Sequence, residues 1–302
     1  MIPRSILAVT DFSIQGTHAV ARAALLCAKH RATLKLVYLA PGDETPPPDA
    51  AVRLSHHALQ LQQRHPITVH AATRTDFTAA NVAVEAKSVD LVVWGTAPLR
   101  GLRAWLSVHP ALRMLRGTPR PVLVVRQRAE RPYQSVMVAV DFSAASRRLA
   151  EWAAALNPSA QIGLFHAIDT ANEGKLRYAE VSEQAIRMYR EECRRHAQSR
   201  MLTLLDSNDA RRNRLFSAMG RGDPAQQALV QQHSMGSDLI VVGKRPRSWL
   251  SDWVFESVAQ RVLHGARTDV LIAPHGFQPA SRGAAIERLA TDRPVRRVKA
   301  GA

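Results

Sequence analysis

The sequence predicts an α/β protein built from two tandem domains, each with a doubly wound parallel sheet. Three short apolar motifs occur twice in the same order: ILAVTDFS returns as VMVAVDFS, DLVVWG as DLIVVG, and PVLVVR as DVLIAP. Apolar segments alternate with helix-like segments between these motifs, which is typical of parallel sheets with right-handed crossovers. The apolar segments are continuous rather than alternating, as expected for strands that are covered on both faces.

The first copy is expected to contain five strands and the helices between them. Residues 6–10 form the first strand, and Ser13 or Thr17 can cap the helix that follows. Three consecutive prolines within residues 43–49 predict a loop. The other strands are expected at residues 33–39, 67–71, 91–94 and 122–125, and the other helices at residues 50–64, 78–86 and near 111–115.

The second copy repeats this order. Its first strand is expected at residues 136–140, and Pro158 ends the helix at 144–156. Pro224 suits the first turn of a later helix. The other strands are expected at residues 162–168, 214–219, 239–242 and 270–273.

The second copy is also longer than the first. The offset from Asp11 to Asp141 is 130 residues, whereas the offset from Asp90 to Asp238 is 148, which leaves 18 extra residues. The stretch at 173–212 is charged and helix-prone. We therefore place the extra length there, as a longer helix or as a helix plus a loop.

These motifs define the predicted domain boundaries. The first domain covers residues 1–128, a short charged linker covers 129–133, and the second domain covers 134–276. A linker of this length requires the two copies to lie close together. Residues 277–302 form a basic tail rich in Arg, Ala, Pro and Gly, which we expect to be largely disordered.

Composition narrows the class of protein. The chain has 302 residues, of which 46% are hydrophobic, and this is enough for two cores. The sequence contains no run of eighteen apolar residues, which a membrane-spanning helix would need, and no signal peptide is recognised. A cytoplasmic location is therefore expected. Cys27 and Cys193 fall in predicted helices of different copies, which argues against a disulfide or a zinc site.

The net charge of +16 leaves a second class of partner open. Basic excess in the first domain and the tail is compatible with binding to nucleic acid or another anion. No basic run is interleaved with aromatic residues, however, as binding to single strands would require. Scattered, solvated arginines are therefore the favoured interpretation.

Several segments resemble the universal stress protein family in its tandem form. The segments are VAVDFSAAS, GDPAQQALVQQHSMGSDLIVVGK and SWLSDWVFESVAQRVLHGARTDVLIAP. The resemblance implies the adenine-nucleotide α-hydrolase-like fold of that family, some members of which bind ATP. Those members carry a Gly-x2-Gly-x9-Gly-Ser/Thr loop after the fourth strand. Glycines there let backbone N–H groups approach the phosphates at a helix N-terminus.

The glycine loop is degenerate in both copies. In the second copy Gly243 and Ser257 keep the first and last positions, but Pro246 and Glu256 replace the two glycines between them. Proline lacks an N–H, and a carboxylate repels phosphate oxygens. In the first copy only Gly95 keeps its position. The next three positions there hold Pro98, Val108 and His109.

The resemblance implies a candidate nucleotide site in the second domain, with the aspartate after the first strand accepting a hydrogen bond from adenine. Its residues are Asp141, Phe142, Ser143, Ala167, Gly243, Lys244, Arg245, Ser257 and Val258. A weaker candidate site in the first domain comprises Asp11, Phe12, Ser13, Leu39, Gly95 and Thr96. Helix capping is the alternative role for the two aspartates.

Other polar residues give no candidate for catalysis or metal binding. His56, His57 and His65 fall on a polar helix, and His166 within a strand is interpreted as a packed core histidine. Asp76 and Asp223 occupy equivalent turns and are expected to cap the helices after them.

The last strand of each copy predicts how the domains associate. The resemblance implies that Val122 to Val125 and Val270 to Ala273 pair across a pseudo-two-fold axis within one chain, and that two chains can associate further as a homodimer. We expect a stress-response binding or signalling module with degenerate nucleotide clefts, no certain cofactor and ATP as a candidate ligand of the second domain. An ATP-binding switch with slow hydrolysis and an anion- or nucleic-acid-binding protein are the alternatives.

Overall fold

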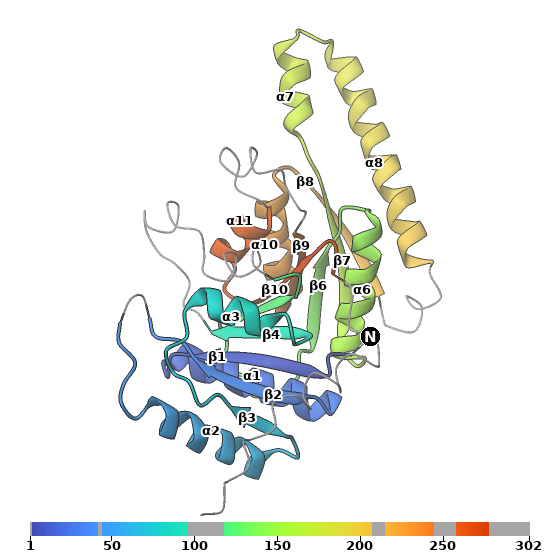
Figure 1. The fold of residues 1–302 in the computed structure, drawn as a ribbon. Coiled ribbons are helices and arrows are strands. Elements are labelled where there is room, and N and C mark those ends of the chain that lie inside the picture. Colours follow the sequence, from blue (N-terminus) through green and yellow to red (C-terminus); the bar gives the residue numbers. More distant parts are fainter. Residues whose placement is uncertain (1, 42–43, 96–117, 207–214, 245–257, 278–302) are drawn as a thin grey trace, which may run out of the picture.

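The computed structural model describes residues 2–41, 44–95, 118–206, 215–244 and 258–277, which form one continuous ten-stranded sheet (Figure 1). The strands are β1 Ser5–Thr10, β2 Thr33–Tyr38, β3 Val69–Ala71, β4 Leu91–Gly95, β5 Val122–Val125, β6 Ser135–Ala139, β7 Gln161–Ile168, β8 Leu215–Arg221, β9 Leu239–Lys244 and β10 Asp269–Pro274. Their order is β3-β2-β1-β4-β5-β10-β9-β6-β7-β8. Each half is parallel throughout, and the two halves join where β5 and β10 pair antiparallel.

Helices cover both faces of this sheet, which confirms the α/β fold class predicted from the continuous apolar strands. The helices are α1 Ile14–His30, α2 Ala50–Arg64, α3 Ala79–Ala86, α6 Ala144–Leu156, α7 Ala171–Tyr178, α8 Glu183–Leu205, α10 Pro224–Met235 and α11 Val258–Gly265. One buried cluster joins alternate strand residues such as Ile6 to α1, α2, α6 and α8. The next strand residue, Leu7, belongs to a second cluster with α3, α10 and α11.

The repeated aspartate before β4 and β9 has the same structural role in both halves. Asp90 Oδ2 accepts hydrogen bonds from the backbone N–H groups of Arg4 and Ser5, at 2.9 and 3.2 Å. Asp238 accepts the corresponding bonds from Gln134 N and Ser135 N, at 2.7 and 3.2 Å. In each half the aspartate therefore ties the start of the first strand to the start of the fourth. This structural role explains why the motif recurs, and no ligand is needed to account for it.

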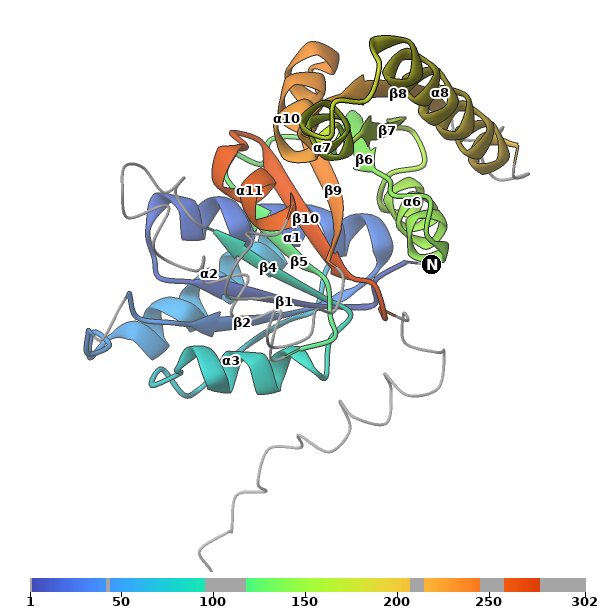
Figure 2. The same ribbon diagram turned by 90° about the horizontal axis from the view of Figure 1, so that it is seen from above.

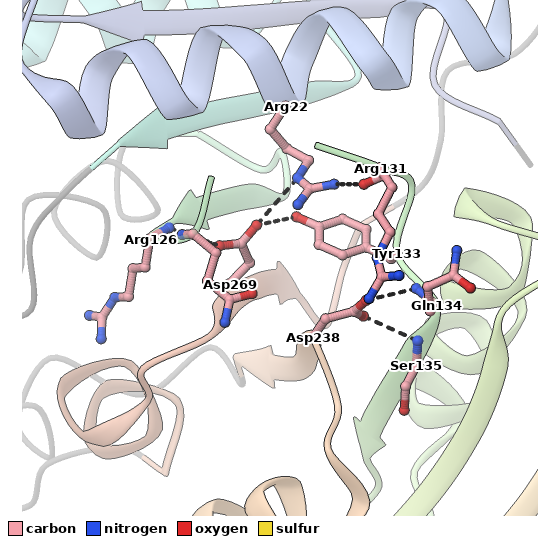
Figure 3. Close-up of polar contacts among 9 residues, drawn as sticks. Arg22, Arg126, Arg131, Tyr133, Gln134, Ser135, Asp238 and Asp269 are labelled. Carbon is pink, nitrogen blue, oxygen red and sulfur yellow. Dashed lines mark hydrogen bonds and ion pairs between the residues drawn. The ribbon is translucent and has the colours of Figure 1, made fainter. Parts of the chain in front are cut away.

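The two domains meet at a buried charged junction (Figure 3). Arg22 reaches from α1 to Asp269 at the start of β10, with 3.4 Å between Nε and Oδ2, and it lies 4.0 Å above the Tyr133 ring. The Tyr133 hydroxyl donates to Asp269 Oδ2 at 2.6 Å, and Arg22 Nη1 donates to the Arg131 carbonyl at 2.7 Å. Burial and the neighbouring Asp269 raise the pKa of Tyr133 well above its ordinary value, so the hydroxyl stays protonated and donates.

An inserted helical hairpin, formed by α7 and α8, distinguishes the second half. It extends beyond the β7–β8 end of the sheet (Figures 1 and 2). Buried Glu173 of α7 anchors it: Arg190 Nε of α8 donates to its Oε2 at 2.9 Å, and Arg221 of β8 donates to its Oε1 at 3.1 Å. The predicted extra length is thus two helices rather than one, and it begins at Ala171.

Neutralising Glu173 is expected to release this hairpin. Burial raises the pKa of Glu173, but the hydrogen bonds from Arg221 and Arg190 outweigh burial and hold it below its ordinary value of 4.5. A depressed folded-state pKa gives stabilisation that is present above the ordinary value and is lost as pH falls through the lowered one. Hydrogen exchange across 171–178 is therefore expected to accelerate in Glu173→Gln at pH 7, and in the unmodified protein as the pH falls below 4.5, after correction for intrinsic rates. Glu183→Gln removes the Arg177–Glu183 pair, whose side chains are 59% and 62% exposed, and should leave exchange unchanged. Equal exchange in the Glu173 and Glu183 variants would contradict the anchoring role of Glu173.

Most predicted elements agree with the structure, and one predicted cap is wrong. Asp223 caps α10 by accepting from Gln226 N at 2.9 Å, but the cap of α3 is Thr78, because Asp76 pairs with Arg74 at 2.9 Å instead. Cys27 is buried in α1, where burial raises the pKa of its thiol to about 12. The helix expected near 111–115 and residues 278–302 of the predicted tail lie outside the described residues. Phe277, assigned to that tail, is instead buried and packs edge-on against Trp152, with 5.5 Å between centroids.

Candidate functional site

A cavity of about 470 Å³ opens at the carboxyl ends of β6, β7 and β9. This is the edge of an open parallel sheet where the strand order reverses and where ligands bind. Its volume falls within the range of small-molecule sites. The lining residues are Ala139, Val140, Asp141, Ser146, Leu149, Phe165, His166, Ala167, Asp169, Pro224, Val242, Gly243, Lys244, Val258, Ala259 and His275.

The loop after β6 fixes Asp141 at the mouth of the cavity. Asp141 Oδ1 accepts from Ser143 N at 3.0 Å and from Ser146 Oγ at 2.7 Å. Phe142 holds a positive φ of 59°, which costs energy for a residue with a side chain and needs support from its surroundings. Arg200 of α8 supplies some of that support by donating to the Phe142 carbonyl at 2.8 Å. The inserted hairpin therefore braces the loop that positions Asp141.

His166 lines the cavity, so the prediction of a packed core histidine is wrong. Its Nδ1 lies 2.8 Å from the Val140 carbonyl, which can only accept, so the neutral ring carries its proton on Nδ1 and leaves Nε2 as an acceptor. Burial lowers the pKa of His166 despite the opposing effects of the Val140 hydrogen bond and Asp141, which favours this neutral form. The ring packs against Phe142, with 4.2 Å between centroids.

His275 is a second histidine of the cavity that the sequence did not indicate. It follows β10, and its backbone N–H donates to the Lys244 carbonyl at 3.0 Å. Its Nε2 lies 3.9 Å from Asp141 Oδ2, and Arg148 donates to its carbonyl at 3.1 Å. A Cβ built on Gly243 would lie only 2.7 Å from His275 Nε2, so the imidazole covers that glycine.

Aromatic and charged side chains pack against one another at the corresponding edge of the first domain. Phe12 repeats the positive φ, at 60°, and stacks on buried Tyr38 with 4.8 Å between centroids. The Arg53 guanidinium lies 4.2 Å from the Phe12 ring centroid, and His57 packs against that ring edge-on. His57 therefore has a packing role that its place on a polar helix did not suggest. Gly95 packs tightly, because a Cβ there would lie 1.9 Å from the Gln15 carbonyl oxygen.

The aspartates brace the loops rather than capping the helices themselves. Ser13 is the cap of α1, accepting from Gly16 N at 3.0 Å, while Asp11 Oδ1 accepts from Ser13 N at 2.9 Å. Asp141 holds Ser143 in the same way. The second carboxylate oxygen of Asp141 faces His275 across the cavity mouth.

The structure brings five residues of the candidate site together around the cavity. Phe142 and Ser143 belong to the same loop but do not line the cavity. Leu39 is half-buried in the first domain. Arg245, Pro246, Glu256 and Ser257 lie outside the described residues, as do Thr96, Pro98, Val108 and His109. The five residues that line the cavity are Asp141, Ala167, Gly243, Lys244 and Val258.

The described residues meet the requirements of neither a metal site nor a membrane-spanning helix. In the described ranges, no three His, Cys, Asp or Glu side chains converge closely enough to hold a metal ion. Among the helices described, none is both long and apolar enough to cross a membrane.

Comparison with known proteins agrees with the duplicated architecture. No curated protein sequence matches the chain. A universal stress protein from Archaeoglobus fulgidus DSM 4304 has a similar structure, with a TM-score of 0.64 at 13% identity, over 89% of this chain and 96% of that one. A functionally unknown protein from Pseudomonas aeruginosa PAO1 has a TM-score of 0.62 at 22% identity, over 96% and 98% of the two chains. At these identities the likeness establishes the fold alone.

The family assignment rests on the sequence of both copies. The model of the universal stress protein family matches residues 3–126 and again residues 132–274. The two matches together span most of the chain and coincide with the two halves of the sheet. The chain therefore belongs to the universal stress protein family, of which it carries two domains in tandem.

Proposed function

We propose that this protein is a stress-response binding module whose second domain binds a ligand of the adenine nucleoside or nucleotide class. The observation that carries the proposal is the cavity at the carboxyl ends of β6, β7 and β9. At the equivalent edge of the first domain, Phe12 packs between Tyr38 and the Arg53 guanidinium. We propose that the second copy binds the ligand and that the first copy gives structural support.

The chemistry of the cavity suits a flat base that carries an amino group. Val140, Ala167 and Val258 give it apolar walls, as planar rings require. Asp141 contributes a carboxylate, and neutral His166 contributes the Nε2 lone pair. Two acceptors beside an apolar slot favour a ring with N–H donors, such as adenine, over one that presents only carbonyl oxygens.

The phosphate end of the site supports binding rather than turnover. Lys244 lines the cavity and can attract an anion. The sequence, however, has Pro246 and Glu256 where ATP-binding relatives are expected to have glycines. Loss of those backbone donors removes groups that would hold a terminal phosphate for attack by water. We therefore propose a binding protein, with ATP hydrolysis absent or slow.

Changing Asp141 to asparagine is expected to weaken adenosine binding by about tenfold or more, because a hydrogen bond to a charged group contributes roughly 1.5–3 kcal/mol. Asparagine keeps an oxygen for Ser143 and Ser146, so the loop should remain folded. Isothermal titration of adenosine and of ATP into the full chain measures the effect.

The first domain offers a matched control for this experiment. Asp11 occupies the same position in the other copy, so Asp11→Asn should leave the affinity unchanged. Equal loss in both variants, or no loss in Asp141→Asn, would refute binding in the second domain. Glu256→Gly adds a further comparison, because a gain limited to ATP would identify this carboxylate as the group that excludes phosphate.

The pseudo-dimer is complete within one chain, which affects how the module assembles. β5 and β10 already pair through Leu123 and Leu271 at the centre of their register. We propose that ligand binding needs no second chain, and that any homodimer uses another surface. Sedimentation of the protein with and without adenosine tests whether binding depends on assembly.

A further inference from the structure

His275 covers the glycine that a nucleotide would approach. Its imidazole stands where a side chain on Gly243 would begin, with Nε2 at 2.7 Å and Cδ2 at 3.0 Å from the built Cβ position. Leu149 Cδ1 lies 3.0 Å from the same point. A glycine serves a phosphate because other atoms can come close to its backbone. In this chain His275 and Leu149 occupy the space into which a side chain on Gly243 would point, while Gly243 itself lines the cavity.

The backbone of His275 is held in place from two sides. Its N–H donates to Lys244 of β9 at 3.0 Å, and its carbonyl accepts from Arg148 of α6 at 3.1 Å. The side chain faces Asp141, with 3.9 Å between Nε2 and Oδ2. The main chain is therefore anchored, and rotation about the side-chain bonds is the simplest way to uncover Gly243.

The charges that line the cavity also disfavour a phosphate. Among the lining residues that the structure describes, Asp141 and Asp169 contribute two carboxylates and Lys244 contributes one ammonium group. Like charges within a few ångströms repel, and the effect grows as water is excluded. An uncharged nucleoside avoids this repulsion and leaves the imidazole undisturbed.

We infer that His275 is a specificity-determining residue, which closes the Gly243 side of the cavity and makes it select nucleosides over nucleoside phosphates. The inference rests on the proposed function, because it concerns the ligand of the same cavity. A phosphorylated ligand must turn the imidazole away from Gly243 before its phosphates can approach the backbone. Adenosine fits beside the ring without this movement.

The test is the ratio of the affinities for ATP and adenosine, measured by isothermal titration into the full chain. The unmodified protein is expected to bind adenosine more tightly than ATP. His275→Ala should bind ATP about tenfold more tightly, with adenosine changing by less than about threefold. His275→Gln keeps a side chain of similar reach and should retain the preference for adenosine. His233→Ala removes an exposed histidine that does not line the cavity and serves as the control.

The outcomes separate this inference from the function on which it rests. If adenosine binds and the ratio is the same in His275→Ala, the inference is wrong and the proposed function stands. If His275→Ala binds ATP less tightly, the imidazole is a phosphate partner and the inference is overturned. If neither ligand binds any variant while all unfold like the unmodified protein, the proposed function fails and the inference fails with it.

Discussion

Replacing Arg22 with methionine is expected to destabilise the protein by about 3–5 kcal/mol, because it leaves the carboxylate of Asp269 buried without its cation. Asp269 is 0% exposed and Arg22 is 4% exposed, so water cannot replace the lost partner. Methionine keeps the apolar length of the side chain and limits the cavity that is left. The free energy of unfolding, measured by urea denaturation, reports the effect.

Two control variants test whether the loss in Arg22→Met comes from the buried charge of Asp269. Arg74→Met breaks the Arg74–Asp76 pair, whose side chains are 60% and 71% exposed, and should leave the midpoint of unfolding unchanged. Arg22→Met combined with Asp269→Asn should recover part of the loss, because the buried charge is removed together with its partner. A midpoint for Arg22→Met equal to that of the unmodified protein would show that the ion pair does not hold the junction together.

Changing Gly95 to alanine is expected to cost about 3 kcal/mol or more, at the upper end of the usual cost of overpacking. The new Cβ would lie 1.9 Å from the carbonyl oxygen and 2.3 Å from the carbonyl carbon of Gln15, which are backbone atoms of α1. Neither a rotamer change nor a side-chain shift can relieve this contact, so β4 and α1 must separate. Urea denaturation again measures the loss.

The equivalent glycine of the second copy provides the comparison. A Cβ at Gly243 would meet the ends of the His275 and Leu149 side chains, which can rotate. Gly243→Ala should therefore cost about 1 kcal/mol or less, within the range of small overpacking effects. Equal losses at the two positions would mean that the edge of the first domain is not packed more tightly than the edge of the second.

The order of strands and helices could be predicted because it depends on local patterns that occur twice. Ser13 precedes a helix in the sequence and caps it in the structure, and Pro224 begins α10 as its fixed φ requires. The pairing of β5 with β10 is also confirmed, but this prediction rests on the resemblance to the family rather than on the residues.

The two histidines of the cavity could not be predicted because their positions depend on strand register. Ala139 at the end of β6 pairs with Phe165, so β7 continues past its neighbour and carries His166 to the open edge of the sheet. In the sequence the surrounding LFHAI looks like an ordinary buried strand. His275 reaches Gly243 only because β10 lies parallel to β9, with Pro274 opposite Lys244.

The joining of both halves in one chain has a consequence for symmetry. In a dimer of two identical chains, every substitution at the interface is present in both subunits. In this chain the first-copy residue equivalent to Asp269, at the 148-residue offset, is Pro121. The second-copy residue equivalent to Arg22, at the 130-residue offset, is Trp152. The Arg22–Asp269 ion pair thus exists once, on one side of the pseudo-two-fold axis.

A covalent link also keeps the halves together on dilution, whereas separate chains would dissociate by mass action. The tandem arrangement therefore lets one copy diverge while the other preserves the fold.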